Sequence, residues 1–236
     1  VLTDVLTSPS TGAAQYALSD TGRLVYAPGT VFGKSRRLVM IDAEGNESDT
    51  GLPPDRYSYV KFAPDGQQLA IEIEGDTPSI WIFGIDNGRL EKIVSNATYP
   101  VWSPDSDKIA YSDISSGGTA IYQVDVRQAQ DIQKIIEADL PLDHSYAWSP
   151  DGGHFAYTLL NRDSGMDIMI IQLSETATPR PLIVSFFNEC CPAFSSDGRW
   201  LAYVSDMTGR PEVHIVSFPG LEETHQISKG GAREPV

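Results

Sequence analysis

The amino-acid sequence predicts an all-β fold, a β-propeller of four-stranded blades. The first observation behind this prediction is a motif of an aromatic residue, two small or turn-forming residues, Asp and usually Gly, which occurs at residues 62–66, 102–106, 148–152 and 194–198. The second is its spacing, because Phe62, Trp102, Trp148 and Phe194 are 40, 46 and 46 residues apart. That period is the length of one propeller blade, whereas a β-sandwich predicts no such period.

The repeats run through nearly all of the 236 residues, so one domain over residues 1–236 is predicted, within a longer protein. A degenerate copy of the motif at residues 18–22 adds a fifth repeat. The five full repeats are predicted at about 12–52, 55–96, 97–138, 143–186 and 188–230. Residues 1–7 and 233–236 match parts of a sixth blade. Three alternatives are left open: the chain is cut within a longer propeller, five blades close the ring, or another chain completes it. An open ring would have unpaired strand edges, which favour an oligomer.

Each repeat is predicted to supply four strands, which in the fourth repeat are residues 145–148, 154–158, 167–173 and 180–184. The second strand usually places a small residue between two large ones, as in Ile109-Ala110-Tyr111, so that neighbouring blades pack closely. The third strands are rich in β-branched and aromatic residues, which is typical of β-structure. Residues 127–137 have some helical spacing, but 131–136 are predicted as an outer strand. Helices are therefore expected to be nearly absent.

The Ser-Pro-Asp-Gly part of the motif predicts a turn, because Pro presets φ, Asp hydrogen-bonds its own backbone and Gly accepts a positive φ. Its aspartates are therefore predicted to be structural and neither catalytic nor metal-binding. The residues assigned to these turns are Asp65, Gly66, Asp105, Asp151, Gly152, Asp197 and Gly198. Ser106 stands where the other copies have Gly, which weakens that turn without removing it.

The chain is strongly acidic, with a formal net charge of −15. This charge argues against unaided binding to nucleic acid or anionic lipid, since both require clustered Lys and Arg. The longest apolar stretches are strand-sized, so no membrane insertion is predicted. The acidic surface suits a neutral or basic partner, or it serves solubility alone.

The two cysteines, Cys190 and Cys191, are adjacent. Neighbouring residues of a strand point to opposite faces, so a disulfide between them is not expected. No Cys/His spacing of a metal site occurs, and neither a metal nor another cofactor is predicted. Cysteine usage leaves the cellular compartment undecided.

The sequence favours a non-catalytic segment, because its motifs do not match those of known catalytic sites. Residues 28–35 resemble a phosphate-binding loop, but Pro28 replaces its first Gly and residues 37–42 are predicted as a strand in place of the required helix. No nucleophile elbow is present. The four histidines fall at different places in their repeats, and His154, His214 and His225 are expected at partly exposed strand positions.

Residues 191–216, 99–105 and 145–152 together resemble the repeat of TolB-type β-propellers, and the resemblance extends over about residues 12–236. It implies a bacterial, periplasmic or otherwise extracytoplasmic propeller, commonly of six blades. Such propellers occur in a periplasmic translocation protein, in prolyl-oligopeptidase-like peptidases and in the C-terminal sensor regions of bacterial Ser/Thr kinases. The opening, residues 8–29, looks most like the kinase-linked group.

Binding is expected at the mouth of the central channel, where the chain leads into the innermost strand of each blade, at residues 55–59, 96–99, 143–146, 188–191 and 232–234. These segments are rich in charged, amide and aromatic groups, which suits a protein or peptide, and the resemblance implies a partner protein on this face. The candidate residues are Asp55, Arg56, Tyr57, Tyr59, Tyr99, His144, Tyr146, Asn188, Glu189, Arg233 and Glu234. An ordinary solvated loop face is the alternative. The predicted function is a non-catalytic sensor or scaffold, with an accessory domain of a prolyl-oligopeptidase-like hydrolase as the second possibility.

Overall fold

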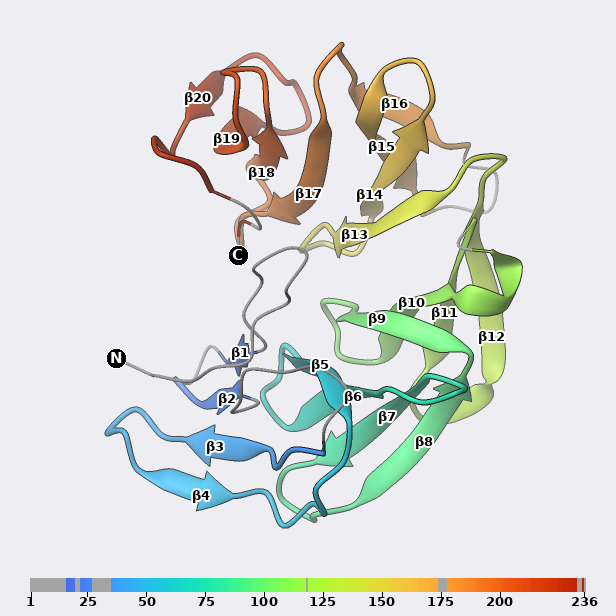
Figure 1. Ribbon diagram of the computed structural model, residues 1–236, viewed down its shortest axis with the longest axis vertical. Coiled ribbons are helices and arrows are strands. Elements are labelled where there is room, and N and C mark those ends of the chain that lie inside the picture. Colours follow the sequence, from blue (N-terminus) through green and yellow to red (C-terminus); the bar gives the residue numbers. More distant parts are fainter. Residues whose placement is uncertain are drawn as a thin grey trace. The chain divides into compact units, whose positions relative to one another are not determined.

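In a computed structural model of the chain, the described residues are 16–19, 22–26, 35–117, 119–173, 178–232 and 235. Within them, twenty strands form five four-stranded sheets (Figure 1), and the only helical element is the 3-10 turn Ile114–Ser116. Each sheet contains four strands that are consecutive in the chain. The predicted fold class, all-β with four-stranded propeller blades, is confirmed.

Each blade corresponds to one sequence repeat. Blade 1 contains β1 (Tyr16–Leu18), β2 (Leu24–Tyr26), β3 (Val39–Ile41) and β4 (Glu47–Asp49). Blade 2 contains β5 (Tyr57–Phe62), β6 (Gln68–Ile73), β7 (Ser79–Gly84) and β8 (Leu90–Ser95). Blade 3 contains β9 (Ala97–Trp102), β10 (Lys108–Asp113), β11 (Ala120–Asp125) and β12 (Gln128–Glu137). The segment with helical spacing is thus the strand β12, as predicted.

The last two repeats form two further blades. Blade 4 contains β13 (Leu142–Trp148), β14 (His154–Asn161), β15 (Gly165–Gln172) and β16 (Arg180–Ile183). Blade 5 contains β17 (Glu189–Phe194), β18 (Trp200–Ser205), β19 (Glu212–Ser217) and β20 (Thr224–Gln226). Several residues predicted in lead-in loops, Tyr57, Tyr99 and Glu189 among them, therefore belong to the first strands themselves.

The chain divides into two compact units. The first comprises Val1–Ser115 and Tyr122–Gln133, and the second comprises Ser116–Ile121 and Lys134–Val236. Blades 1 and 2 belong to the first unit, and blades 4 and 5 belong to the second. The single domain over residues 1–236 stays a prediction.

The core of the first unit lies between successive blades. Ala70, in the middle of β6, is fully buried and packs in one cluster with Trp102 and Ile109 of blade 3. A larger side chain at Ala70 would separate the two sheets, so the small residue between two large ones has the role that the sequence predicts. A second cluster joins blades 1 and 2 through Val25 and Leu69.

The second unit has its own core. Ile168 and Leu182 of blade 4 form one cluster with Leu201 and Val216 of blade 5. Burial of each such side chain stabilises the fold by about 1.5–3 kcal/mol. These contacts hold the two blades of this unit together.

The motif turns have the geometry that their residues favour. Gly66, Gly152 and Gly198 have φ values of 69°, 69° and 68°. The side chain of Asp151 accepts a hydrogen bond from the backbone N–H of Gly153 at 2.9 Å, and the remaining copies have the same bond. In those copies Asp65 accepts from Gln67, Asp105 from Asp107, and Asp197 from Arg199. The carboxylates therefore close the turns from within.

Some predicted features lie outside the described residues. These are residues 1–7, most of the loop at 28–35, and Arg233 and Glu234. The strand predicted after that loop is present as β3. In the described part of the chain, no helix is long and apolar enough to cross a membrane.

Candidate binding site

The pairing of strands defines which residues share one end of a blade. In blade 5, Glu189 at the start of β17 faces Ser205 at the end of β18, which faces Glu212 at the start of β19. The equivalent row in blade 2 begins at Tyr57. We call this the lead-in end, because here the chain enters the first strand of each blade. The Asp turns lie at the opposite end.

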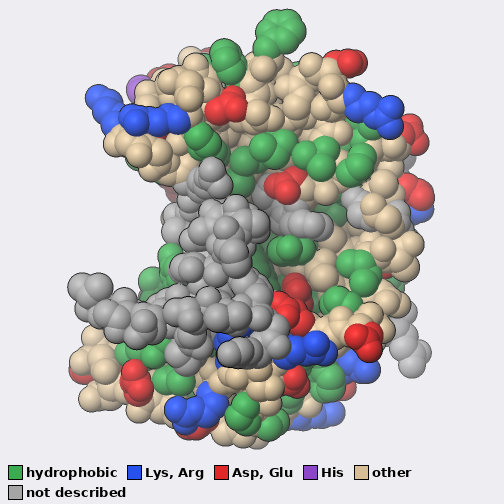
Figure 2. Space-filling model, in the orientation of Figure 1, with side chains coloured by type: hydrophobic (Ala, Val, Ile, Leu, Met, Phe, Trp, Pro, Cys, Tyr) green, Lys and Arg blue, Asp and Glu red, His purple; other side chains and the backbone are tan. Residues whose placement is uncertain are grey.

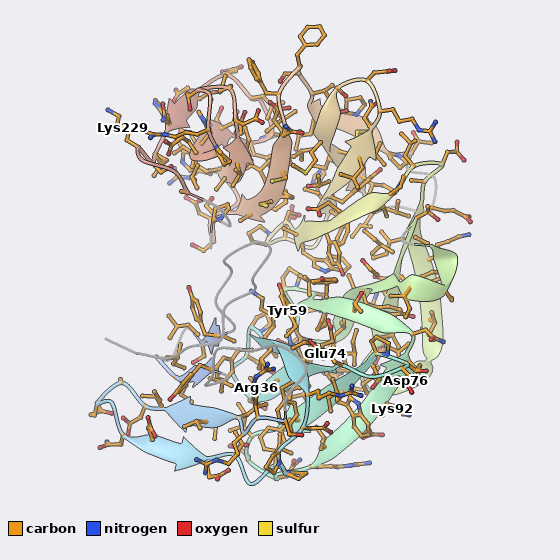
Figure 3. The ribbon with its side chains drawn as sticks, viewed as in Figure 1. Arg36, Tyr59, Glu74, Asp76, Lys92 and Lys229 are labelled. Carbon is orange, nitrogen blue, oxygen red and sulfur yellow. The ribbon has the colours of Figure 1, made fainter. Side chains whose placement is uncertain are left out.

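At the lead-in end of the first unit, part of the predicted set is engaged in the fold. The backbone N–H and C=O of Asp55 pair with those of Arg36 at 3.0 and 2.7 Å. Arg36, which is labelled in Figure 3, is buried. Its guanidinium donates to the carbonyl of Tyr57 at 3.2 Å. The carbonyl of Arg56 accepts a backbone bond from Glu74 at 2.9 Å.

Tyr57 belongs to the hydrophobic core of blades 1 and 2. Its hydroxyl donates to the carbonyl of Pro53 at 2.6 Å. Burial, with a smaller contribution from the Asp55 charge, raises the pKa of Tyr57 to about 12. The buried Tyr57 side chain thus fixes the segment that leads into blade 2.

Tyr59 and Tyr99 are brought together, as a pair of partly exposed rings from β5 and β9. Their centroids are 5.7 Å apart with the planes at 70°, an edge-to-face contact. The ammonium of Lys61 lies 5.4 Å from the Tyr59 centroid. An aromatic surface with an adjacent cation is therefore present on this unit.

A buried carboxylate supports that surface. The backbone N–H of Tyr99 donates to Glu72 Oε2 at 2.7 Å, and Ser58 Oγ donates to Glu72 Oε1 at 2.8 Å. Burial raises the pKa of Glu72, although both hydrogen bonds oppose the rise. Glu72 thereby connects the second strand of blade 2 to the first strand of blade 3.

In the second unit, Asn188 connects the β16–β17 and β18–β19 loops to the start of β15. Its backbone and side-chain N–H groups donate to the two oxygens of Asp206 at 2.9 and 2.7 Å. Its amide oxygen accepts from the backbone of Met166 at 3.2 Å. A Cβ on Gly165 would lie 2.5 Å from that oxygen, so the close approach requires glycine. These bonds fix the entry to β17.

At this lead-in end, two carboxylates are buried, and within the described part of the chain each has one oxygen that accepts no hydrogen bond. Glu189 is 3% exposed, and its Oε1 accepts from Ser185 at 2.7 Å and Ser205 at 3.2 Å. Asp167 is 2% exposed and accepts from Asn161 and Ser164 through Oδ2. Among the described residues, Glu189 Oε2 and Asp167 Oδ1 have no hydrogen-bond partner. Burial, with smaller contributions from the Asp167 and Asp206 charges, raises the pKa of Glu189.

The same segment exposes apolar side chains that sequence reasoning missed. Phe186 is 96% exposed, and Val184 and Phe187 are also exposed in the connection from β16 to β17. Figure 2 shows apolar side chains standing out from the surface of blades 4 and 5. The available signal was two consecutive phenylalanines between predicted strands, just before Asn188. We call residues 184–189 the aromatic lead-in.

The remaining candidates divide between core and undescribed positions. Tyr146 is buried, with its ring 5.5 Å from that of Phe155. The side chain of His144 is outside the described set, as are Arg233 and Glu234.

A family model of the TolB β-propeller domain matches residues 99–234, more than half of the chain. The chain belongs to the TolB β-propeller family. The matched residues run from β9 to the end of blade 5 and include both Tyr99 and the aromatic lead-in.

Relatives of this TolB-type propeller are distant in sequence. It is 27% identical over 174 residues to the uncharacterized protein Atu1656 of Agrobacterium fabrum, covering 71% of this chain and 57% of that protein. TolB from Acinetobacter baumannii has the same fold with a TM-score of 0.73 at 17% identity, over 92% of this chain and 54% of that one. A puromycin-hydrolyzing peptidase of Mycobacterium tuberculosis also has a TM-score of 0.73 at 17% identity, over 98% of this chain and 41% of the peptidase. The chain thus spans between 41% and 57% of these three proteins, and the structural likeness shows the fold alone.

Features that would indicate chemistry in this TolB-type propeller are few. The described residues contain no group of three or more His, Cys, Asp or Glu side chains placed to hold a metal ion. His214 is buried against Tyr203, with ring centroids 5.6 Å apart, and burial lowers its pKa. The expectation that His214 is partly exposed was wrong, because the residue is 3% exposed and its ring stacks on the Tyr203 ring of the neighbouring strand.

A shallow hollow lies at the turn end of the second unit. Its volume is about 360 Å³, and its lining consists of residues 149–151, 196–198 and Phe218. Its carboxylates, Asp151 and Asp197, are held by the turns described above. Hydrogen bonds from Ser195 and from Arg199 lower the pKa of Asp197 to about 2.

Proposed function

We propose that this TolB-type propeller binds a protein or peptide through the aromatic lead-in, as a non-catalytic sensor or scaffold region of a larger protein. The observation that carries the proposal is the exposure of Phe186 beside a rigid polar framework. Covering a fully exposed Phe side chain is worth about 1.5–3 kcal/mol, so a partner gains affinity there. Aromatic side chains are also the usual anchors of protein interfaces.

The polar residues of the aromatic lead-in are preorganised. Asn188 is held by Asp206 and Met166, and Glu189 is held by Ser185 and Ser205. A partner therefore orders few additional groups when it binds, which lowers the entropic cost of association. The net charge of −15 favours a neutral or basic partner, and electrostatic attraction would speed its approach.

A peptide-display experiment tests this proposal. A random peptide library is selected against the wild-type chain, and dissociation constants of the enriched peptides are measured by fluorescence anisotropy. The variant F186S/F187S is expected to bind at least about tenfold more weakly, which corresponds to about 1.4 kcal/mol. The matched control is L18S/I132S, which removes two exposed apolar side chains of the first unit. No enrichment, or equal loss in both variants, would contradict the proposal.

The second candidate function is an accessory propeller of a hydrolase. It is supported by the structural likeness to the puromycin-hydrolyzing peptidase, which covers 98% of this chain. The sensor version rests on the expectation from the sequence that residues 8–29 are most like kinase-linked propellers. Reading the open reading frame on both sides distinguishes them, because a kinase domain with a membrane helix supports sensing and a Gly-x-Ser-x-Gly elbow supports the hydrolase.

An extracytoplasmic location and self-association belong to the same proposal. Membership of the TolB family supports the location. Fractionation of cells that produce the full-length protein tests it, and recovery in the cytoplasm would oppose it. Light scattering of the purified chain tests for an oligomer.

A further inference from the structure

The two cysteines of β17 lie side by side. Their sulfur atoms are 3.0 Å apart, and both side chains are half-buried. The sequence predicted opposite faces, and this was wrong because β17 contains a β-bulge. Cys190 faces Val204 and Ala193 faces Ala202, so two residues of β17 oppose the single residue between them on β18. Cys191 has a φ of 60° there.

The bulge does not depend on the thiols, because blade 3 has it as well. In β9, Tyr99 has a φ of 56° and is followed by Pro100, as Cys191 is followed by Pro192. The register of β9 on β10 shifts at the same place. The same backbone geometry thus occurs in both blades, and in blade 5 two cysteines occupy it with their sulfur atoms in contact.

We propose that Cys190 and Cys191 form a reversible dithiol–disulfide site, oxidised by a small-molecule or protein disulfide. One thiolate attacks a sulfur of the oxidant, forms a mixed disulfide and releases the first thiolate of the oxidant. The other cysteine thiolate then attacks its neighbour's sulfur, which closes the Cys190–Cys191 bond and releases the second thiolate of the oxidant. Two electrons pass to the oxidant, and the two protons leave with its two thiols.

This disulfide would be readily reduced, which suits a reversible switch more than a structural disulfide. The Cα atoms of residues joined by a trans peptide are about 3.8 Å apart, whereas ordinary disulfides prefer about 4.4–6.8 Å. The ring is therefore strained, and strained disulfides have more oxidising potentials. Closing it alters the backbone of β17 two residues after Asn188, and the inference does not depend on the proposed function.

The chain contains only two cysteines, which makes the test direct. The reduced 236-residue chain is treated with oxidised glutathione under denaturant-free conditions, and intact mass is measured. The expected product is a monomer that has lost two hydrogen atoms, carries no glutathione and returns to the thiol form with dithiothreitol. C190S and C191S should instead carry one glutathione.

The matched control moves the pair to a regular strand. E47C/S48C, made in a C190S/C191S background, places adjacent cysteines on β4, whose pairing with β3 has no bulge. It is expected to retain at least about tenfold more glutathione adduct than the wild type, because its thiols are not held together. A wild type that stays reduced, carries glutathione or cross-links into dimers would overturn the proposal, as would equal closure in the control.

Discussion

Tyr99 and Cys191 adopt the same unusual backbone conformation in two different blades, with φ values of 56° and 60°. Each is followed by proline and stands three residues before the aromatic residue of an Asp turn. A non-glycine residue in this region costs about 1–3 kcal/mol, so the surrounding structure must compensate. In blade 3 the compensation includes the hydrogen bond from the Tyr99 N–H to Glu72.

Removing Glu72 should therefore destabilise the first unit. E72A leaves the Tyr99 N–H and the Ser58 hydroxyl without their side-chain acceptor, and the free energy of unfolding should fall by about 2–3 kcal/mol. Urea denaturation measures it. S58A, which removes only one of the bonds, should cost about 1 kcal/mol, and equal losses in the two variants would argue against the bridging role of Glu72.

Glu189 should be dispensable for stability at neutral pH. Its folded pKa is raised, so its contribution to stability is fully present below the unfolded pKa of about 4.5 and is lost as pH rises through the folded value. E189Q keeps an acceptor for Ser185 and Ser205 without the charge. Its melting temperature at pH 7 should be no lower than that of the wild type, and a drop of several degrees would contradict this prediction.

Glu212 should behave in the opposite way. Bonds from Ser228, from the backbone of Gly230 and Gly231 and from Arg210 lower the pKa of Glu212 to about 2. Its stabilising contribution is therefore present above pH 4.5 and is lost as pH falls toward 2. E212Q should lower the melting temperature at pH 7, with a smaller difference at pH 3. Thermal scans of the wild type and E212Q at pH 7 and pH 3 measure this. An equal difference in melting temperature at both pH values would contradict the coupling of stability to the ionisation of Glu212.

The close approach at Gly165 can be separated from its backbone conformation. Gly165 and Gly209 have φ values of 94° and 88°, but only Gly165 has a neighbour, Asn188, where a Cβ would stand. G209A should cost about 1 kcal/mol, and G165A should cost more by at least about 1 kcal/mol. In an N188A background the two glycine replacements should cost about the same. Persistence of the difference there would show that Asn188 is not its cause.

Ser106 combines a strain with a compensating contact. Its φ is 61°, where the other turns have Gly, and its hydroxyl accepts from the backbone N–H of Asp65 at 3.1 Å. S106G relieves the strain and loses the bond, so its stability should stay within about 1 kcal/mol of the wild type. S106A keeps the strain and loses the bond, and it should be about 1 kcal/mol less stable than S106G. Equal urea midpoints for the two variants would contradict this account.

The sequence was informative where one residue type controls local geometry. The Asp turns, the small residue between large ones and the outer strand β12 follow from periodicity and turn chemistry. The bulges could not be predicted, because a residue before proline is normally extended and only tertiary hydrogen bonds hold Tyr99 in the left-handed region. Tyr57 and Tyr146 were indistinguishable in sequence from exposed lead-in residues, since burial depends on the neighbouring blade. The exposure of Phe186 could not be predicted either, because it too depends on the neighbouring structure.

Hydrogen exchange of the chain, alone and saturated with a library-selected peptide, tests most directly whether the aromatic lead-in is the binding surface. The predicted result is slower exchange at residues 184–191, with residues 149–153 of the turn end unchanged. Protection confined to the turn end, or none at the aromatic lead-in, would contradict it.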